Sequence, residues 1–491
     1  MFANKLPNHD DLVSLFSHER EVPTHSGRWF LFVPAAISSN LSLPWLNGLL
    51  TLTYIAIGAM LVCATFRLEK KPLQILTAGL LVTFPTLVAT FNYMYTADGY
   101  FFGLLLVALA IFWHNSRQRF GWLGGAILIL LATAIYQAWL PVAASLTVLL
   151  IINQLLQKPS LASPKLPAFI SKSLAMPAIA LILYVASIFA AQHLGGMVLN
   201  EHANINQLGQ IFWSKLLQQF QNAYDTSSDF FIHDQFRVHF FGLPIFITLA
   251  SLVTLIQLGI IIKTEKIYRH TPRFISLLIA LLVLPLTAGL IHLLAYDSRQ
   301  DLMVLYALSS LPLSVLIIIN HLPNTLRSWL KITAFFSLAT LGLMIYSYIV
   351  AANQGYLRLH FIYEQNYAYA LRLLSRLENL PNYHPDLPIY LIGEPDFAIH
   401  QSIPAFDDKK TTTLGFDTFT DSHLLPNFLQ TYLGYTNSKS LVTLTPQQGC
   451  QILPSQTIAG FDTYPAANSI QIIGEAIYVN FQTTWTCPFS N

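Results

Sequence analysis

The chain has 491 residues, of which 54% are apolar and only 10% are charged. Soluble globular proteins carry about 25% charged residues, so a single water-facing globule of this length is nearly excluded. The 33 Phe, 22 Tyr and 8 Trp exclude a disordered chain, and a formal net charge of +2 excludes a strongly basic nucleic-acid binder. The composition therefore indicates a polytopic membrane protein.

Apolar stretches long enough to cross a membrane recur along the first 352 residues. A helix needs about 20 mostly apolar residues to cross a hydrocarbon core of ~30 Å, and a charge at the bilayer centre is costly. Ten nearly uncharged stretches meet this condition and predict ten transmembrane helices. They are 44–66, 73–92, 98–114, 121–139, 141–157, 173–193, 242–262, 274–295, 302–320 and 331–352.

Lys and Arg residues are concentrated in alternate connections between these stretches. The connections after the first, third, fifth, seventh and ninth spans contain 14 basic residues, whereas those on the other side contain only Lys215, Arg237 and Arg299. Because basic loops stay in the cytoplasm, we expect the N-terminal segment and everything after residue 352 to lie outside it. Two arrangements of the N-terminus stay open: translocation of a short tail without a span, or an initial span that this chain lacks.

The predicted organisation has three parts. Residues 1–28 form an exterior loop, residues 29–354 form the transmembrane domain with a further exterior loop at 194–241, and residues 355–491 form a small α/β domain outside the cytoplasm. Within the second loop, apolar residues at helical spacing predict an amphipathic helix on the membrane surface. They are Leu208, Ile211, Phe212, Leu216, Phe220 and Tyr224.

Apolar runs shorten to strand length in the last part of the chain. An amphipathic helix around Tyr367 and Leu377 is followed by predicted strands at 387–392 and 440–444 and by a hairpin at 469–481. Cys450 and Cys487 are the only two cysteines of this part, and in an oxidising compartment such a pair forms a disulfide or stays as two buried thiols. Both alternatives remain open.

Adjacent carboxylates mark the first exterior loop. Asp10 and Asp11 lie about 17 residues before the membrane boundary at Gly27-Arg28-Trp29. Mutual repulsion and partial desolvation raise the proton affinity of one member of such a pair, so the pair is a candidate general base. The same oxygens suit a divalent cation, although no cofactor is certain, and a solvated acidic loop is the third interpretation.

Other exterior residues near the membrane boundary are candidates for binding. Asp98 begins the third span, where it either complements the helix dipole or binds a sugar hydroxyl beside the rings of Tyr93 and Tyr95. Arg28 and Arg299 are rare exterior cations, and a guanidinium fits the phosphate of a lipid carrier as well as ordinary headgroups.

Together these residues favour one task, the transfer of a lipid-borne, phosphate-activated group to an acceptor outside the cytoplasm. Three alternatives stay open, which are a transporter or flippase of lipid-linked glycans, a glycan polymerase or ligase, and a scaffold without catalytic activity. The spans are almost free of ionisable residues, whereas transporters usually place such groups along their helices.

The order of several short motifs resembles one enzyme family over essentially the whole chain. The sequence is similar to the Gtr type II O-antigen glucosyltransferases, membrane enzymes of the GT-C class. The motifs are His9-Asp10-Asp11, Gly27-Arg28-Trp29, Leu43-Pro44, Gly48-Leu49-Leu50, Tyr93 to Asp98, Ile135-Tyr136-Gln137-Ala138, Ala370-Leu371-Arg372, Leu377-Glu378, Ile389 to Gly393 and the Ser469 to Val479 hairpin.

This resemblance implies a GT-C-like fold and a hexosyltransferase of the bacterial inner membrane. It implies a polyprenyl-phosphate donor, usually of glucose, a lipid-linked O-antigen acceptor, membrane-lipid contacts and catalysis on the periplasmic face, with a donor synthase and a flippase as companions. It also implies that Asp11 or Asp10 is the base, with Asp11 preferred, and that the Tyr136-Gln137 motif helps to bind sugar.

Overall fold

The structure is a computed structural model, in which the chain forms two compact units. The first unit comprises Met1–Asn4 and Phe16–Gly355, and the second comprises Lys5–Leu15 and Tyr356–Asn491. The sequence predicted residues 1–28 as one loop, whereas the structure assigns Lys5–Leu15 to the same unit as the C-terminal region. The described residues are 9–13, 26–116, 118–157, 166–195, 198, 216–294, 302–323, 328–393, 424–435, 441–453, 458 and 460–482.

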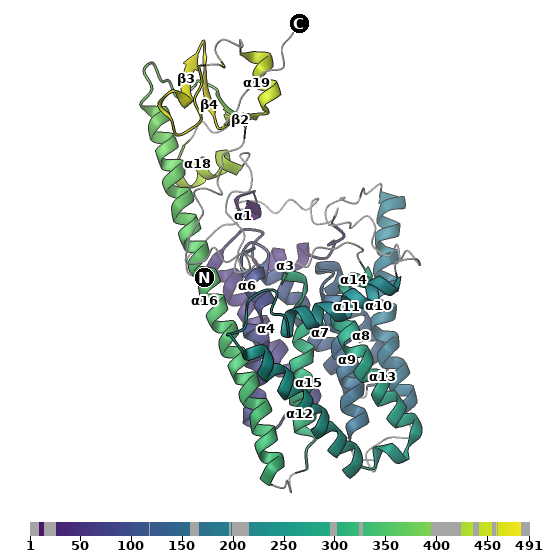
Figure 1. Cartoon of the computed structure of the whole chain (residues 1–491). Coiled ribbons are helices and arrows are strands. Elements are labelled where there is room, and N and C mark those ends of the chain that lie inside the picture. The colour runs from purple at the N-terminus through teal and green to yellow at the C-terminus, as the bar shows by residue number, and fades with distance from the viewer. Residues whose placement is uncertain are drawn as a thin grey trace. The chain divides into compact units, whose positions relative to one another are not determined.

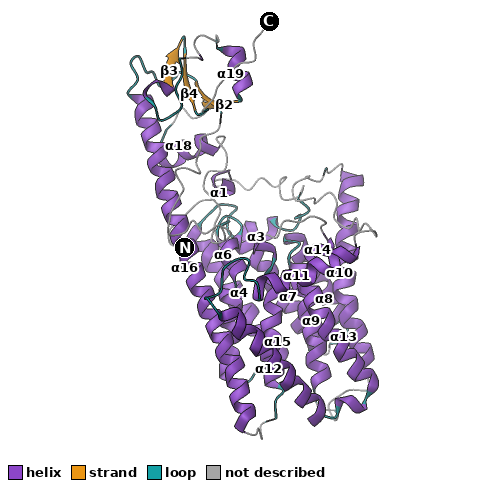
Figure 2. Cartoon of the chain, in the orientation of Figure 1, coloured by secondary structure: helices purple, strands orange, loops and turns teal. Residues whose placement is uncertain are grey.

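The first unit is a bundle of long helices that run side by side (Figures 1 and 2). Within the described residues, eight helices are long and apolar enough to cross a membrane. This confirms the prediction of a polytopic helical membrane protein. They are α4 (Pro44–Phe66), α5 with α6 (Lys71–Thr83 and Pro85–Phe91), α7 (Ala97–Asn115), α9 (Trp139–Leu156), α10 (Leu166–Gly195), α12 (Leu243–Thr264), α13 (Thr271–Ala288) and α16 (Ser328–Glu378).

The fourth and ninth predicted spans are shorter in the structure than the sequence predicted. Helix α8 covers Gly121–Ile135, and η6 with α15 covers Tyr306–Asn320. The predicted span at 121–139 ends early because Tyr136 is extended, so that α9 begins as a separate helix at Trp139. The shorter elements of the unit are α3 (Phe32–Ile37), α11 (Leu216–Phe231), η4 (Ile267–Arg269), α14 (Ile291–Leu294) and η5 (Leu302–Val304).

Two predicted helices have other boundaries in the structure, and a third is observed in part. The predicted span at 73–92 breaks at Phe84, because Pro85 disfavours a helical conformation at the residue before it. The span at 331–352 and the amphipathic helix after it form one continuous helix of 51 residues, α16. The amphipathic helix of the second loop is observed as α11, whereas Leu208, Ile211 and Phe212 lie outside the described residues.

Hydrogen bonds gather several basic connections at one end of the bundle, which we call the basic end. The Asn320 amide donates to the carbonyl of Arg67 over 3.2 Å, and the Asn115 amide donates to the carbonyl of Thr65 over 2.9 Å. Arg273 donates to the carbonyls of Leu155 and Gln157. The ends of α4, α7, α9 and α15 and the start of α13 therefore lie together, as alternating spans require.

The second unit contains a four-stranded sheet in the order β2-β1-β4-β3. Strand β1 (Ile389–Ile392) pairs in parallel with β2 (Leu441–Leu444) and β4 (Ala476–Asn480), and β3 (Ile470–Ile473) pairs antiparallel with β4. The predicted strands and hairpin are all observed. Because β1 is a central strand, Ile389 and Leu391 are fully buried against α16 and α18 (Leu425–Leu433) in the core.

The cysteines of the described residues have two different states. Cys63 in α4 is a free thiol, and Cys450 in α19 (Pro446–Ile452) is disulfide-bonded. Cys487 lies outside the described residues, so the predicted pairing of Cys450 with Cys487 stays a prediction.

Candidate active site

Residues 26–40 wrap around the first turn of α7 at the end opposite the basic end. Gly27 adopts a left-handed φ of +73°, and a Cβ there would lie 2.6 Å from the Tyr184 hydroxyl oxygen, so only glycine fits. A Cβ on Gly99 would lie 2.7 Å from Leu31, which shows how closely this segment packs on α7. The segment is therefore held in one position relative to the helix that carries Asp98.

Arg28 lies against two stacked tyrosine rings. The rings of Tyr100 and Tyr136 are nearly parallel with centroids 4.4 Å apart, and the Arg28 guanidinium carbon lies 5.6 Å and 5.1 Å from their centroids. Arg28 Nη1 donates to the Tyr100 hydroxyl over 2.6 Å. Its Nε is buried without a hydrogen-bond partner among the described residues. The site thus holds an oriented cation with an unused donor.

Gln137 and Tyr184 fix the backbone next to Arg28. The Gln137 amide donates to the Ser26 carbonyl over 2.8 Å and to the Tyr184 hydroxyl over 3.0 Å, and that hydroxyl donates to the Gly27 carbonyl over 3.1 Å. Of the predicted sugar-binding pair, Gln137 therefore positions the backbone beside Arg28, and Tyr136 contributes a ring to the arginine itself.

Asp98 is the buried carboxylate at this end of the bundle. It lies in the first turn of α7 and is only 1% exposed. Ser38, in the turn after α3, and the backbone N–H of Gly99 lie within hydrogen-bonding reach of the carboxylate. Its Oδ2 has no partner among the described residues. The helix start explains part of the placement of Asp98, but burial of an unsatisfied carboxylate oxygen needs a further reason.

The connection from α6 to α7 contains further buried polar atoms of this kind. The side-chain amide nitrogen and oxygen of Asn92 and the hydroxyl oxygen of Thr96 have no hydrogen-bond partner among the described residues. Asn47 of α4 donates to the carbonyls of Met94 and Tyr95 over 3.1 Å and 3.3 Å, and this fixes the turn. Tyr93 and Tyr95 are half-buried in it. Unsatisfied buried polar atoms in so short a stretch are typical of a site that binds a polar ligand.

The two N-terminal aspartates belong to the second unit. They lie in α1 (His9–Val13), which contacts α18. Asp11 is fully buried and Asp10 is half-buried, and Leu12 joins the core of that unit. Burial raises the pKa of Tyr432, and the charges of Tyr363 and Asp11 add to that shift. Exposure therefore favours Asp10 over Asp11 as the accessible carboxylate. The other predicted phosphate-binding residue, Arg299, lies outside the described residues.

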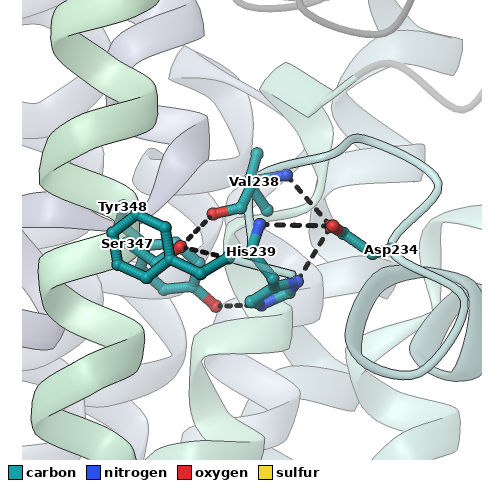
Figure 3. Close-up of polar contacts among 6 residues, drawn as sticks. Asp234, Val238, His239, Ser347 and Tyr348 are labelled. Atoms are coloured by element: carbon teal, nitrogen blue, oxygen red, sulfur yellow. Dashed lines mark hydrogen bonds and ion pairs between the residues drawn. The ribbon is translucent and has the colours of Figure 1, made fainter. Parts of the chain in front are cut away.

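A second polar cluster anchors the loop between α11 and α12 to α16 (Figure 3). Asp234 Oδ1 accepts hydrogen bonds from Val238 N over 2.9 Å and from His239 Nδ1 over 2.9 Å. The buried ring of His239 places Nε2 3.4 Å from the Tyr348 hydroxyl. Ser347 donates to the Val238 carbonyl over 2.8 Å. Aromatic rings of Phe230, Phe231 and Tyr348 surround the ring of His239, so the cluster positions the loop rather than forms a reaction centre.

Several residues that build these two clusters were not predicted as site residues from the sequence. They are Ser38, Asn92, Tyr100, Tyr184, Asp234 and His239. Tyr184 had a usable signal, because it and Ser187 interrupt an otherwise apolar span, and Ser187 accepts a 3.0 Å hydrogen bond from Trp29 Nε1. Asp234 and His239 had none, because acidic and histidine residues are unremarkable in an exterior loop.

Metal-binding potential is limited in the part of the chain that the structure describes. There, no three or more His, Cys, Asp or Glu side chains gather in a way that could hold a metal ion. The divalent cation considered for Asp10 and Asp11 therefore stays a prediction.

Comparison with known proteins identifies the family. The family model described as Glucosyl transferase GtrII matches residues 1–317, well over half of the chain. Neither the curated proteins nor the solved structures include a match. The matched range contains every residue of the Arg28 and Asp98 site, whereas most of the second unit lies beyond it. The chain therefore belongs to the glucosyl transferase GtrII family, whose members are glycosyltransferases of O-antigen modification.

Proposed function

We propose that this protein transfers glucose from a polyprenyl-phosphate donor to a lipid-linked O-antigen glycan at the periplasmic face of the bacterial inner membrane. The family supports glucose and O-antigen. The observation that carries the proposal is the cation at the end of the bundle opposite the basic end: Arg28 is oriented by Tyr100 and Tyr136 and keeps its Nε unused.

Arg28 is suited to the leaving group of this reaction. When an acceptor oxygen attacks the anomeric carbon, the bond between that carbon and the phosphate oxygen breaks and negative charge develops on the polyprenyl phosphate. A guanidinium forms paired hydrogen bonds with phosphate oxygens. An oriented cation at a site of developing charge lowers the barrier by several kcal/mol. Arg299 is a second candidate for the same phosphate.

The proton of the acceptor hydroxyl needs a carboxylate, and the chain has three candidates. The family resemblance favours Asp10 or Asp11, of which Asp10 is the more exposed. Asp98 is the candidate added by the described geometry, since its Oδ2 is buried without a partner. A positioned base typically contributes 10²–10⁴-fold to the rate, whereas a carboxylate that only binds a sugar hydroxyl contributes much less.

The basic connections support the proposed sidedness. Connections rich in Lys and Arg stay in the cytoplasm, and hydrogen bonds gather several of them at the basic end. The site around Arg28 lies at the other end, so we propose that it faces the periplasm. A donor made in the cytoplasm then requires a synthase and a flippase as partners.

The direct test is transfer of labelled glucose by the purified protein, reconstituted in lipid, from polyprenyl-phosphate glucose to lipid-linked O-antigen. We expect a new glucose branch on the glycan, detected by mass spectrometry. Asp10→Asn combined with Asp11→Asn should lower the rate at least 100-fold if this pair contains the base. Unchanged transfer by the double variant removes the pair from the mechanism, and translocation of the glycan without a new glycosidic bond contradicts the proposed function.

A further inference from the structure

The second unit contains an open pocket between one face of α16 and the turn at Tyr464-Pro465. Its volume is about 590 Å³, enough for a sugar or two. The residues that line it are Tyr369, Leu371, Arg372, Ser375, Arg376, Tyr464 and Pro465. All of them lie in the second unit, beyond residue 317 where the family match ends.

Helix α16 presents its pocket residues at helical spacing. Tyr369, Arg372 and Arg376 are three and four residues apart, so they share one face. The ring of Tyr464 meets that face: its centroid lies 5.4 Å from the Tyr369 ring and 5.3 Å from the Arg376 guanidinium carbon. The pocket thus combines two cations with two tyrosine rings.

Arg376 is locked in place. Its Nη1 donates to the Pro465 carbonyl over 2.6 Å, and its Nη2 donates to the carbonyls of Ala466 and Ala467 over 2.8 Å and 3.0 Å. These contacts use the hydrogen-bonding capacity of Arg376 but leave its charge uncompensated, because among the described residues no carboxylate pairs with it. Arg376 therefore shapes the pocket and contributes a positive potential.

Arg372 is the available cation. Its side chain is exposed, and its only described polar contact is with the Tyr464 hydroxyl. Burial raises the pKa of Tyr464, while the charges of Arg376 and Arg372 act in the opposite direction. Two like charges one helical turn apart disfavour each other, so an anion between them would relieve a repulsion that no described carboxylate compensates.

We propose that this pocket binds a glycan segment that carries an oxyanion, with a sugar ring against Tyr464 and the carboxylate or phosphate on Arg372. A flat tyrosine ring with a few fixed polar groups is typical of a site for an amphipathic small ligand, and Arg is the side chain that best fits a carboxylate or a phosphate. The inference rests on the proposed function, because it assigns the pocket to the acceptor glycan rather than to the donor.

The test compares three glucosides that differ only at C6. Methyl glucoside carries an alcohol there, methyl glucuronoside a carboxylate, and methyl glucoside 6-phosphate a phosphate. Titration of the full-length protein in lipid nanodiscs, by calorimetry or ligand-observed NMR, gives the dissociation constants. We expect at least one charged probe to bind about tenfold more tightly than the neutral one, and the tighter of the two identifies the oxyanion.

Variants of exposed residues assign the binding to the pocket. Arg372→Gln should weaken binding of the preferred charged probe about tenfold and leave the neutral probe within twofold, and Arg372→Lys should lie between. Lys331→Gln removes the same charge from an exposed position near the start of α16 and should change none of the three constants.

Three results overturn the inference. They are equal binding of the neutral and charged probes, unchanged binding by Arg372→Gln, and inorganic phosphate alone binding as tightly as the charged glucosides. The assay contains neither donor nor lipid-linked acceptor, so its outcome does not depend on glucose transfer. Lost transfer with intact probe binding contradicts only the proposed function.

Discussion

The two ends of α7 differ in how their polar side chains are hydrogen-bonded. At Asn115 the helix end is hydrogen-bonded to two neighbouring helices. The Asn115 amide donates to the Thr65 carbonyl, and its oxygen accepts from the Gln154 amide over 3.2 Å. At the other end, 17 residues or ~26 Å earlier, Asp98 and the preceding turn leave buried polar atoms unsatisfied among the described residues. The amide of Asn115 is thus satisfied by neighbouring helices, and we infer that the unsatisfied atoms around Asp98 are available to a ligand.

Two arginines at opposite ends of the bundle show a similar contrast. Arg273 at the basic end donates to two carbonyls at the end of α9, as expected for a side chain that stabilises a helix terminus. Arg28 at the opposite end is held by tyrosine rings and a hydroxyl. Each arginine leaves one buried nitrogen without a partner among the described residues, Nη1 in Arg273 and Nε in Arg28, so the contrast lies in the groups that hold them, backbone carbonyls in one case and tyrosine side chains in the other. We therefore expect separable effects of the two arginines, on stability for Arg273 and on catalysis for Arg28, and variants can test this separation.

Arg28→Ala should have the largest effect. Loss of the cation removes stabilisation of the leaving phosphate, so we expect kcat/KM for glucose transfer to fall about 100-fold, or about 2.7 kcal/mol. Arg28→Lys keeps the charge without the fork and should fall in between. Full activity of the alanine variant, at an unchanged melting temperature, would show that this end of the bundle is not the reaction site.

Arg273→Ala should lower stability instead. The carbonyls of Leu155 and Gln157 lose a charged donor, which costs about 2 kcal/mol, so the melting temperature in detergent should fall by several degrees while transfer per folded molecule stays the same. Arg269→Ala is the matched control, because Arg269 is exposed on the same connection and its guanidinium lies over the face of Tyr268. A selective loss of transfer by Arg273→Ala would remove the contrast between the two ends.

Asp98→Asn should reduce transfer about tenfold, or about 1.4 kcal/mol, if the carboxylate binds a sugar hydroxyl. A loss of 100-fold or more identifies it as the base instead. The melting temperature should not fall, because the amide removes a buried, incompletely paired charge. Asp225→Asn, at an exposed position of α11, should leave both measurements unchanged, and equal transfer by the two variants would exclude Asp98 from the site.

Tyr184→Phe should have the smallest effect. It removes the hydroxyl that links Gly27 to Gln137, which costs about 1 kcal/mol of stability and a few-fold in transfer through a less firmly held Arg28. Tyr346→Phe tests the same chemical change at an exposed site and should be silent. Thermal unfolding measures the stability of both variants, and initial rates measure their transfer. If Tyr184→Phe changes neither, the hydroxyl is not needed to hold the backbone at Gly27.

Much of the fold was predictable because its signals are local. Uninterrupted apolar stretches predicted the helices, and the alternation around Gly474-Glu475 predicted the β3–β4 hairpin. The errors concern where helices end: α5 ends before Phe84, next to Pro85, and α16 continues past the predicted end of its span. Half of the site was also within reach: Arg28, Asp98, Tyr136 and Gln137 were singled out, but the contacts among them were not.

By itself the sequence determined the helical membrane architecture, the order of the elements and the family, because hydrophobic periodicity and motif order are written residue by residue along the chain. Only the tertiary structure decided that Arg28 lies on rings 72 and 108 residues away, and that one oxygen of Asp98 is buried without a partner. Contacts of this range depend on how helices pack, and packing follows from side-chain shapes that meet only after folding.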